Sequence, residues 1–271
     1  MREIVSDEEK IINKVKQRLL EEKERYLKIP PLLKHVNDSI DIINKIKLYN
    51  GNGKKIEIQR ISRQETIIPI GSISIWVKQR TSYRDDEKKL SLPVLCKSIL
   101  QEELTKYYAQ KVGVFIPPEE IEKWDYKTKG FEAFVYENPY NSDEVYKIVR
   151  YNKVMGGDLS DFFDRLLAFN EMSPLTSYNL VGFTEYENKL TPVVSQPIIV
   201  GNEIVSGNEY EEFKEQYRKM DYEIVQDEED NELIWLKKEG YIAKDLHWRN
   251  VLKTQQGEYV IIDANIRKDI D

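Results

Sequence analysis

Residues 241–264 read YIAKDLHWRNVLKTQQGEYVIIDA, and this segment carries the most specific pattern in the sequence. Two β-rich runs, Val251 to Lys253 and Tyr259 to Ile262, flank the pair Gln256-Gly257. A glycine-containing pair between two such runs is typical of a tight turn that joins antiparallel strands. The stretch therefore predicts a short β-hairpin.

Three oxygen-bearing side chains lie at the ends of this predicted hairpin. Asp245 stands at the end of a short predicted strand and precedes Asn250 by five positions, and Asp263 follows Asn250 by thirteen. Folding of the hairpin brings Asp263 back towards Asn250, and carboxylate and amide oxygens suit Mg²⁺ that is shared with substrate phosphates. An ordinary surface hairpin is the alternative, since Asp, Asn and Gly are common in turns. The second Asp, flanked by apolar strand residues, favours a site.

The order of these residues resembles the catalytic loop of the protein-kinase-like superfamily in its aminoglycoside-phosphotransferase-like form. In that form Asp-Leu-His precedes the Asn, as Asp245-Leu246-His247 precedes Asn250, and Ile262-Asp263-Ala264 takes the place of Asp-Phe-Gly. Within the superfamily the chain is most similar to the polyvalent protein kinase domains of bacterial mobile elements and phages. The resemblance covers about residues 125–271 and leaves residues 1–115 outside it.

The resemblance implies an ATP- and Mg²⁺-dependent phosphotransferase that transfers the γ-phosphate to a hydroxyl group. Asp245 would accept or orient the proton of that hydroxyl, and Asn250 and Asp263 would hold Mg²⁺ on the nucleotide. Lys147 lies in the middle of an alternating, strand-like run and would bind the α- and β-phosphates. A lysine on the solvated face of a strand is the alternative for this residue.

A carboxylate on the helix after that strand is expected to hold the phosphate-binding lysine. Glu171 is the preferred candidate, because similar families carry an Asn-Glu pair at this place, as Asn170-Glu171 does here. Asp161 and Asp164 on the same predicted helix compete with it.

Two further regions are expected to contact the nucleotide. Gly130 is the single glycine of a strand–turn–strand run in which protein kinases carry three, so fewer backbone N–H groups can approach a phosphate closely here. Gln196 and Ile198 would supply backbone groups to the adenine, because Pro197 between them has no N–H. A plain strand that ends at proline is the alternative.

The sequence also departs from the kinase pattern. Ala243 stands where many relatives have a histidine, Ala264-Asn265 replaces Phe-Gly, and eight residues follow Asp263, too few for an activation segment. Strands around the acidic run 227–230 are predicted in place of the long helix that normally precedes the catalytic loop. These departures suggest a small substrate or a site completed by another chain or by the amino-terminal unit. Their alternative is a catalytically inactive, pseudokinase-like binding or interaction module.

The fold class predicted for the whole chain is α+β. Residues 1–115 are expected to form a mixed α/β unit of unknown role, and residues 116–271 a bilobal kinase-like domain. That domain comprises a small lobe at about 125–196, a hinge at about 196–200 and a reduced large lobe at 201–271. The predicted helices are 7–28, 32–48, 92–112, 159–171 and 209–220; the predicted strands are 55–61, 73–77, 131–136, 144–151, 180–186, 191–196, 222–225, 233–236, 251–253 and 259–262.

Composition limits the classes of function. With 41 Lys and Arg against 48 Asp and Glu, the net charge of −7 opposes general nucleic-acid binding. A local basic and aromatic mixture is the exception, and it comprises Arg60, Arg63, Trp76, Lys78, Arg80, Tyr83 and Arg84. Such a mixture of residues more often forms the charged, solvent-exposed face of a strand, so a nucleic-acid partner is not expected.

The remaining composition points to an intracellular protein. The single Cys96 excludes a disulfide framework and a Cys-rich zinc site. His35 and His247 are the only histidines, so a histidine metal site is not expected, and His247 is predicted to brace the catalytic loop. A charged amino terminus and the lack of a long apolar run predict a soluble, cytoplasmic protein without a membrane partner. The expected partners are a nucleotide and an unidentified small-molecule or protein acceptor.

Overall fold

The computed structural model describes residues 7–28, 34, 36–37, 39–40, 94–130, 133–150, 159–204, 206–226, 234–247 and 249–269. The predicted strands 55–61 and 73–77 and most of the predicted helix 32–48 lie outside these residues. The same holds for His35, the acidic run 227–230, and the basic and aromatic residues Arg60, Arg63, Trp76, Lys78, Arg80, Tyr83 and Arg84.

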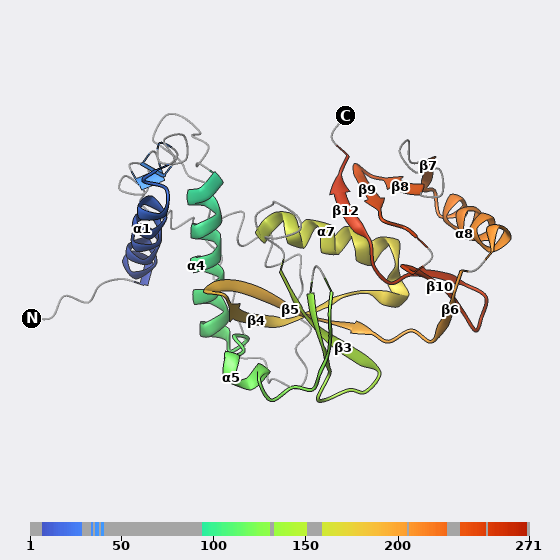
Figure 1. Ribbon diagram of the computed structural model, residues 1–271, viewed down its shortest axis with the longest axis horizontal. Coiled ribbons are helices and arrows are strands. Elements are labelled where there is room, and N and C mark those ends of the chain that lie inside the picture. The colour runs from blue at the N-terminus through green and yellow to red at the C-terminus, as the bar shows by residue number, and fades with distance from the viewer. Residues whose placement is uncertain are drawn as a thin grey trace, which may run out of the picture.

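An antiparallel five-stranded sheet forms the centre of the structure (Figure 1). Its strands lie in the order β1-β2-β3-β5-β4. Their bounds are β1 Tyr126–Lys129, β2 Ala133–Glu137, β3 Glu144–Val149, β4 Asn179–Tyr186 and β5 Lys189–Pro197. The sequence predicted every one of these strands except β1, whose residues are exposed and lack an apolar alternation.

The helix α7 (Leu159–Met172) packs on this sheet, and α4 (Val94–Val112) packs beside it. One continuous hydrophobic cluster joins the three elements: Ala109, Val112, Val114, Leu159, Phe162, Phe163, Leu166, Leu180, Phe183, Leu190 and Val194. The packing therefore does not divide near residue 115, where the sequence predicts a domain boundary. We now propose that α4 belongs with the sheet.

A close backbone contact also crosses that position. The short helix α5 (Pro118–Ile121) follows the segment 114–116, which runs along β4. Phe183 donates its N–H to the Val114 carbonyl at 3.0 Å and accepts from Ile116 at 2.7 Å. A Cβ atom at Gly182 would lie 2.3 Å from the Val114 oxygen, so only glycine allows this approach.

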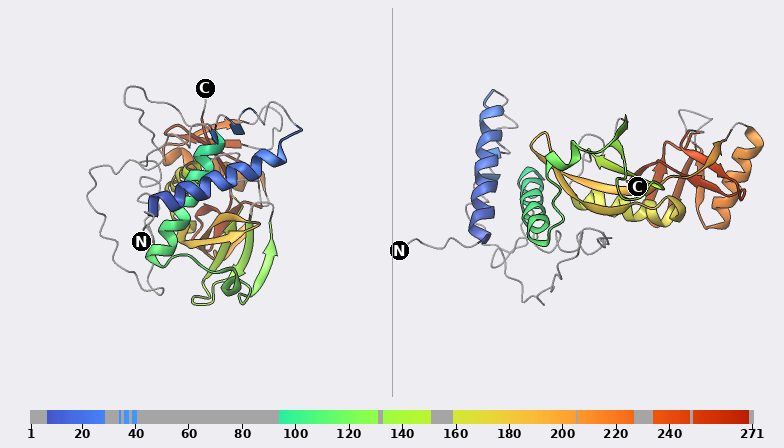
Figure 2. Two further views of the ribbon diagram at one scale, coloured as in Figure 1. Left: turned by 90° about the vertical axis from the view of Figure 1, so that its left-hand side faces the viewer. Right: turned by 90° about the horizontal axis from the view of Figure 1, so that it is seen from below.

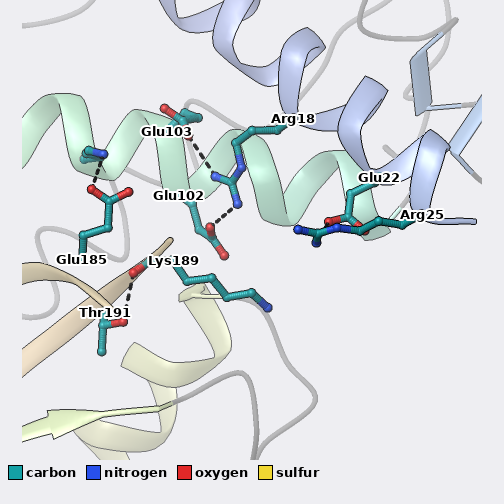
Figure 3. Close-up of polar contacts among 9 residues, drawn as sticks. Arg18, Glu22, Arg25, Glu102, Glu103, Glu185, Lys189 and Thr191 are labelled. Atoms are coloured by element: carbon teal, nitrogen blue, oxygen red, sulfur yellow. Dashed lines mark hydrogen bonds and ion pairs between the residues drawn. The ribbon is translucent and has the colours of Figure 1, made fainter. Parts of the chain in front are cut away.

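The amino-terminal helix α1 (Asp7–Arg25) packs on the face of α4 that points away from the sheet, as Figure 2 shows. Their contact buries Ile11, Val15 and Leu19 of α1 against Ile99, Leu100 and Leu104 of α4. Arg18 adds ion pairs of 2.6 Å to Glu102 and 2.9 Å to Glu103 (Figure 3). Because α4 is covered on two sides, its apolar residues are spread around the helix and not confined to one stripe.

After β5 the chain forms two smaller sheets and the helix α8 (Gly207–Lys219) (Figure 1). One sheet has the order β11-β10-β6 and the other β12-β9-β8-β7. The bounds are β6 Gly201–Glu203, β7 Glu223–Gln226, β8 Ile234–Lys238, β9 Tyr241–Lys244, β10 Val251–Thr254, β11 Tyr259–Ile261 and β12 Asn265–Lys268. The predicted hairpin and the strands predicted in place of a long helix are confirmed; β6 and β12 were not predicted.

The helices of the described residues were compared with the length and hydrophobicity of membrane-spanning helices. None of them combines the length and the apolar character that crossing a bilayer requires.

Gly182→Ala tests the contact between β4 and the segment 114–116. We expect the substitution to lower the free energy of unfolding by roughly 1–3 kcal/mol, because the added methyl group must displace a backbone oxygen. Gly207→Ala is the matched control, since its Cβ would meet nothing within 4 Å at the start of α8. Urea denaturation of both variants measures the difference, and equal stabilities would contradict the close approach.

Candidate active site

Asp245 lies directly after β9, at the start of the loop that leads to β10. Its backbone has a φ of 64°, in the left-handed region that costs most residues about 1–2 kcal/mol. Asn250 holds this turn, since its Nδ2 donates to the Asp245 carbonyl at 2.8 Å and lies 3.4 Å from Oδ2. The Asp245 side chain is 59% exposed, which leaves its carboxylate accessible.

His247 braces the same loop. Its Nδ1 accepts a hydrogen bond from the Arg249 N–H at 3.1 Å, and its carbonyl accepts one from the Asn250 N–H at 2.9 Å. Its Nε2 lies 3.5 Å from Asp245 Oδ1. Because Nδ1 is an acceptor, the proton of the neutral ring lies on Nε2, which faces the carboxylate. These contacts agree with the bracing role predicted for His247.

The hairpin β10–β11 brings Asp263 beside Asn250. Val251 pairs with Ile261 in the antiparallel register, and the Ile262 N–H donates to the Asn250 carbonyl at 2.9 Å. Asp263 is the next residue along the chain.

A cleft of about 320 Å³ lies between the five-stranded sheet and this hairpin. Gly130 and Lys147 line it from the sheet, and Asp245, Asn250 and Asp263 line it from the loop after β9 and the end of the hairpin. An apolar wall is formed by Ala133, Val135, Val149, Phe162, Leu166 and Phe169. Five of the predicted site residues are thus brought together, although they come from segments far apart in the sequence.

Lys147 is held by a tyrosine. Its Nζ donates to the Tyr178 hydroxyl at 3.2 Å and lies 5.1 Å from the centroid of the same ring. Asn170 of α7 in turn fixes the Tyr178 backbone: Oδ1 accepts from its N–H at 2.7 Å, and Nδ2 donates to its carbonyl at 2.8 Å. The position of the ammonium group is therefore linked to α7 through Tyr178.

Glu171, predicted to hold Lys147, does not line the cleft. It is exposed and lines a second pocket of about 170 Å³, together with Asp164 and Tyr222. Burial raises the pKa of the Tyr222 phenol to about 12, and the charges of Glu171 and Glu239 act in the same direction. Asp161 does not line the cleft either; the charged α7 residue that does so is Arg165.

The predicted hinge residues also lie apart from the cleft lining. Gln196 is buried within β5, where it pairs with Val145, and its side chain is turned to backbone carbonyls of the interior. Ile198 is 50% exposed, and its N–H donates to the Asp143 carbonyl at 2.8 Å. In the structure neither residue lines the cleft, and the backbone of each is already paired with another part of the chain.

Gly130 does line the cleft, but its backbone groups are engaged. Its N–H donates to the Ala133 carbonyl at 2.9 Å, and its carbonyl accepts from Arg150 Nη2 at 2.6 Å. In this conformation the Gly130 backbone lies at the cleft, but its N–H is not available to a phosphate.

The polar residues of the cleft suit a magnesium ion that is shared with phosphate. Among the described residues no cluster of three or more His, Cys, Asp or Glu side chains could hold a metal by itself. The Asp263 carboxylate and the Asn250 amide leave coordination positions for phosphate oxygens and water, which is the usual arrangement for Mg²⁺. The donor set therefore fits the ion.

Comparison with known proteins agrees with this geometry. The family described as Serine/Threonine/Tyrosine Kinase found in polyvalent proteins matches residues 99–269, more than half of the 271-residue chain, and the match includes most of α4. No curated protein matches the chain. The chain belongs to the family of Ser/Thr/Tyr kinases found in polyvalent proteins.

Proposed function

We propose that the protein is an ATP- and Mg²⁺-dependent phosphotransferase that transfers the γ-phosphate to a hydroxyl group of a small acceptor. Membership in the kinase family supports a kinase-like phosphotransferase in general. The observation that carries the proposal is the shared cleft, which Lys147, Asp245, Asn250 and Asp263 all line. The five-stranded sheet with α4 and α7 would be the small lobe, and the residues after Pro197 would be a reduced large lobe.

Each polar residue has one task in this proposal. Asn250 and Asp263 would hold Mg²⁺, which neutralises the charge of the phosphate groups when it is bound. Lys147 would contact the α- and β-phosphates, and the apolar wall would exclude water from the nucleotide. Phosphoryl transfer needs mainly positioning and electrostatic stabilisation, and these residues can supply both.

Asp245 would act on the acceptor. Its exposed carboxylate can accept a hydrogen bond from the acceptor hydroxyl and orient that oxygen towards the γ-phosphate. The proton of the hydroxyl would pass to the carboxylate as the new P–O bond forms, while the bond between the γ-phosphorus and the β–γ bridging oxygen breaks and ADP leaves. The contacts of Asn250 and His247 fix the loop and limit the orientations of the carboxylate.

A pseudokinase-like binding or interaction module is the second candidate. The charged residue of α7 that lines the cleft is Arg165, and none of the described carboxylates of this helix does so. The Ile198 N–H already donates to the Asp143 carbonyl. An inactive module of this kind would bind ATP without hydrolysis or transfer, or would not bind it at all.

Asp245→Asn tests the proposed reaction. We expect turnover, measured as ADP release with Mg²⁺-ATP, to fall by roughly 10²- to 10⁴-fold, because the amide cannot accept the proton. ATP binding, followed as a shift in melting temperature, should remain nearly unchanged, since Asp245 is not expected to contact the nucleotide. Wild-type turnover in this variant would remove the proposed base, and no ADP release from the wild-type protein with any acceptor would favour the pseudokinase module.

Tyr178→Phe tests how Lys147 is held. We expect ATP to bind roughly 10- to 100-fold more weakly, because a hydrogen bond to a charged group contributes about 1.5–3 kcal/mol and the ring contact is retained. Titration calorimetry measures the dissociation constant. Tyr126→Phe on the edge strand β1 is the control, since its ring is 51% exposed and distant from Lys147 in the sheet order. Equal affinities of the two variants would contradict a role of Tyr178.

A further inference from the structure

We propose that Ser173, Thr176 and Gln196 are positioning residues for the metal-binding carboxylate of Asp263. They would act through the backbone of the two residues that precede Asp263. The inference rests on the proposed function, because it concerns the same magnesium site. These three residues are called the buried polar cluster below.

Two hydroxyl groups of the cluster bind Ile261, the last residue of β11. Ser173 Oγ donates to the Ile261 carbonyl at 2.9 Å and accepts from the Ile261 N–H at 3.2 Å. Thr176 Oγ1 donates to the same carbonyl at 2.6 Å. Since β11 is an edge strand of its sheet, these side chains take the place of a neighbouring strand.

Gln196 binds the next residue along the chain. Its Nε2 donates to the Ile262 carbonyl at 3.1 Å and to the Thr176 carbonyl at 3.0 Å. Gln196 belongs to β5, whereas Ile262 follows β11, so this amide connects the five-stranded sheet to the segment that carries Asp263. The predicted role of Gln196 was contact with adenine through its backbone, and the geometry points instead to its side chain.

Burial of the three side chains favours a single arrangement of these hydrogen bonds. The exposed fractions of Ser173, Thr176 and Gln196 are 2%, 0% and 4%. In such an environment a satisfied polar network holds its members in one arrangement, because every alternative leaves a buried group unpaired. Burial also raises the pKa of the neighbouring Tyr217 phenol, which contacts Ser173 and the Ile261 backbone and stays protonated.

The two backbone groups of Ile262 connect the cluster to both metal-binding residues. Its N–H binds the Asn250 carbonyl, and its carbonyl binds Gln196. Asp263 follows directly, so a displacement of Ile262 would move Asp263 relative to Asn250. Magnesium demands near-ideal octahedral geometry with ligands at about 2.0–2.1 Å, and a small displacement therefore weakens its binding.

Thr176→Val and Gln196→Met test this inference. Each variant keeps the approximate size of the side chain and removes its hydrogen bonds to β11 or Ile262. The measurement is Mg²⁺ titration into the complex of the full chain with ADP, followed by calorimetry, and ADP binding without metal is measured in parallel. This readout does not require catalytic turnover.

The chain offers a matched control for each variant. Thr184→Val makes the same change at a threonine that is 1% exposed on β4 and whose hydroxyl makes no hydrogen bond in the structure. Gln216→Met removes an amide that binds both backbone groups of Tyr259, at the opposite end of β11 from Asp263. Thr184→Val therefore measures the effect of the exchange of Thr for Val itself. Gln216→Met measures the effect of loosening the far end of β11.

We expect Mg²⁺ to bind about tenfold more weakly in Thr176→Val and Gln196→Met, as is usual when a residue that orients a metal ligand is removed. Metal-free ADP affinity and both controls should stay within about twofold of the wild type. Thr176→Ser, which keeps the hydroxyl, should restore Mg²⁺ affinity. If Gln196→Met does not fold, the Mg²⁺ affinities of Thr176→Val, Thr176→Ser and Thr184→Val still test the inference.

Two outcomes would overturn the inference: wild-type Mg²⁺ affinity in the folded cluster variants, or an equal loss in the controls. Asp263→Asn separates this failure from failure of the proposed function. If Asp263→Asn binds Mg²⁺ like the wild type, the metal site itself is wrong. If it loses Mg²⁺ while the cluster variants retain it, only the positioning role is wrong.

Discussion

The antiparallel pairing of β10 with β11 is the constraint on which the rest of the site depends. Asn250 and Asp263 are thirteen positions apart, and the hydrogen bond from Ile262 to Asn250 makes them neighbours. A shift of one residue in this register would turn every side chain of β11 to the opposite face. Buried Val251 and Ile261 pair directly and oppose such a shift, so the apolar core of the hairpin also fixes the polar residues at its end.

Short-range patterns made this hairpin predictable from sequence. Gly257 has a φ of 84°, as a glycine in a tight turn should, and the apolar residues on both sides form the predicted strands. The same patterns gave α7, α8, β7 and β8 to within a few residues. β12 was missed because four residues are too few to show an alternation, and its pairing with β9 is a long-range contact.

The partners of Lys147 and Gln196 could not be found in this way, because they are set by tertiary packing. Tyr178 lies 31 positions from Lys147, and Ile262 lies 66 positions from Gln196. Glu171 is different, since helical geometry alone argues against it. Phe169 packs inward, and a residue two positions later on a helix points about 200° around the axis, on the opposite side.

The strands found in place of the expected long helix hold the start of the loop that carries Asp245. Ala243 lies in β9, one of the two inner strands of its four-stranded sheet, and pairs with Leu236 on one side and Ile266 on the other. It is 2% exposed, so the small side chain fits a site enclosed by two neighbouring strands. Backbone hydrogen bonds on both edges of β9 thereby fix the start of the loop. The strained backbone of Asp245 can persist there because the strand before it cannot rotate to relieve it.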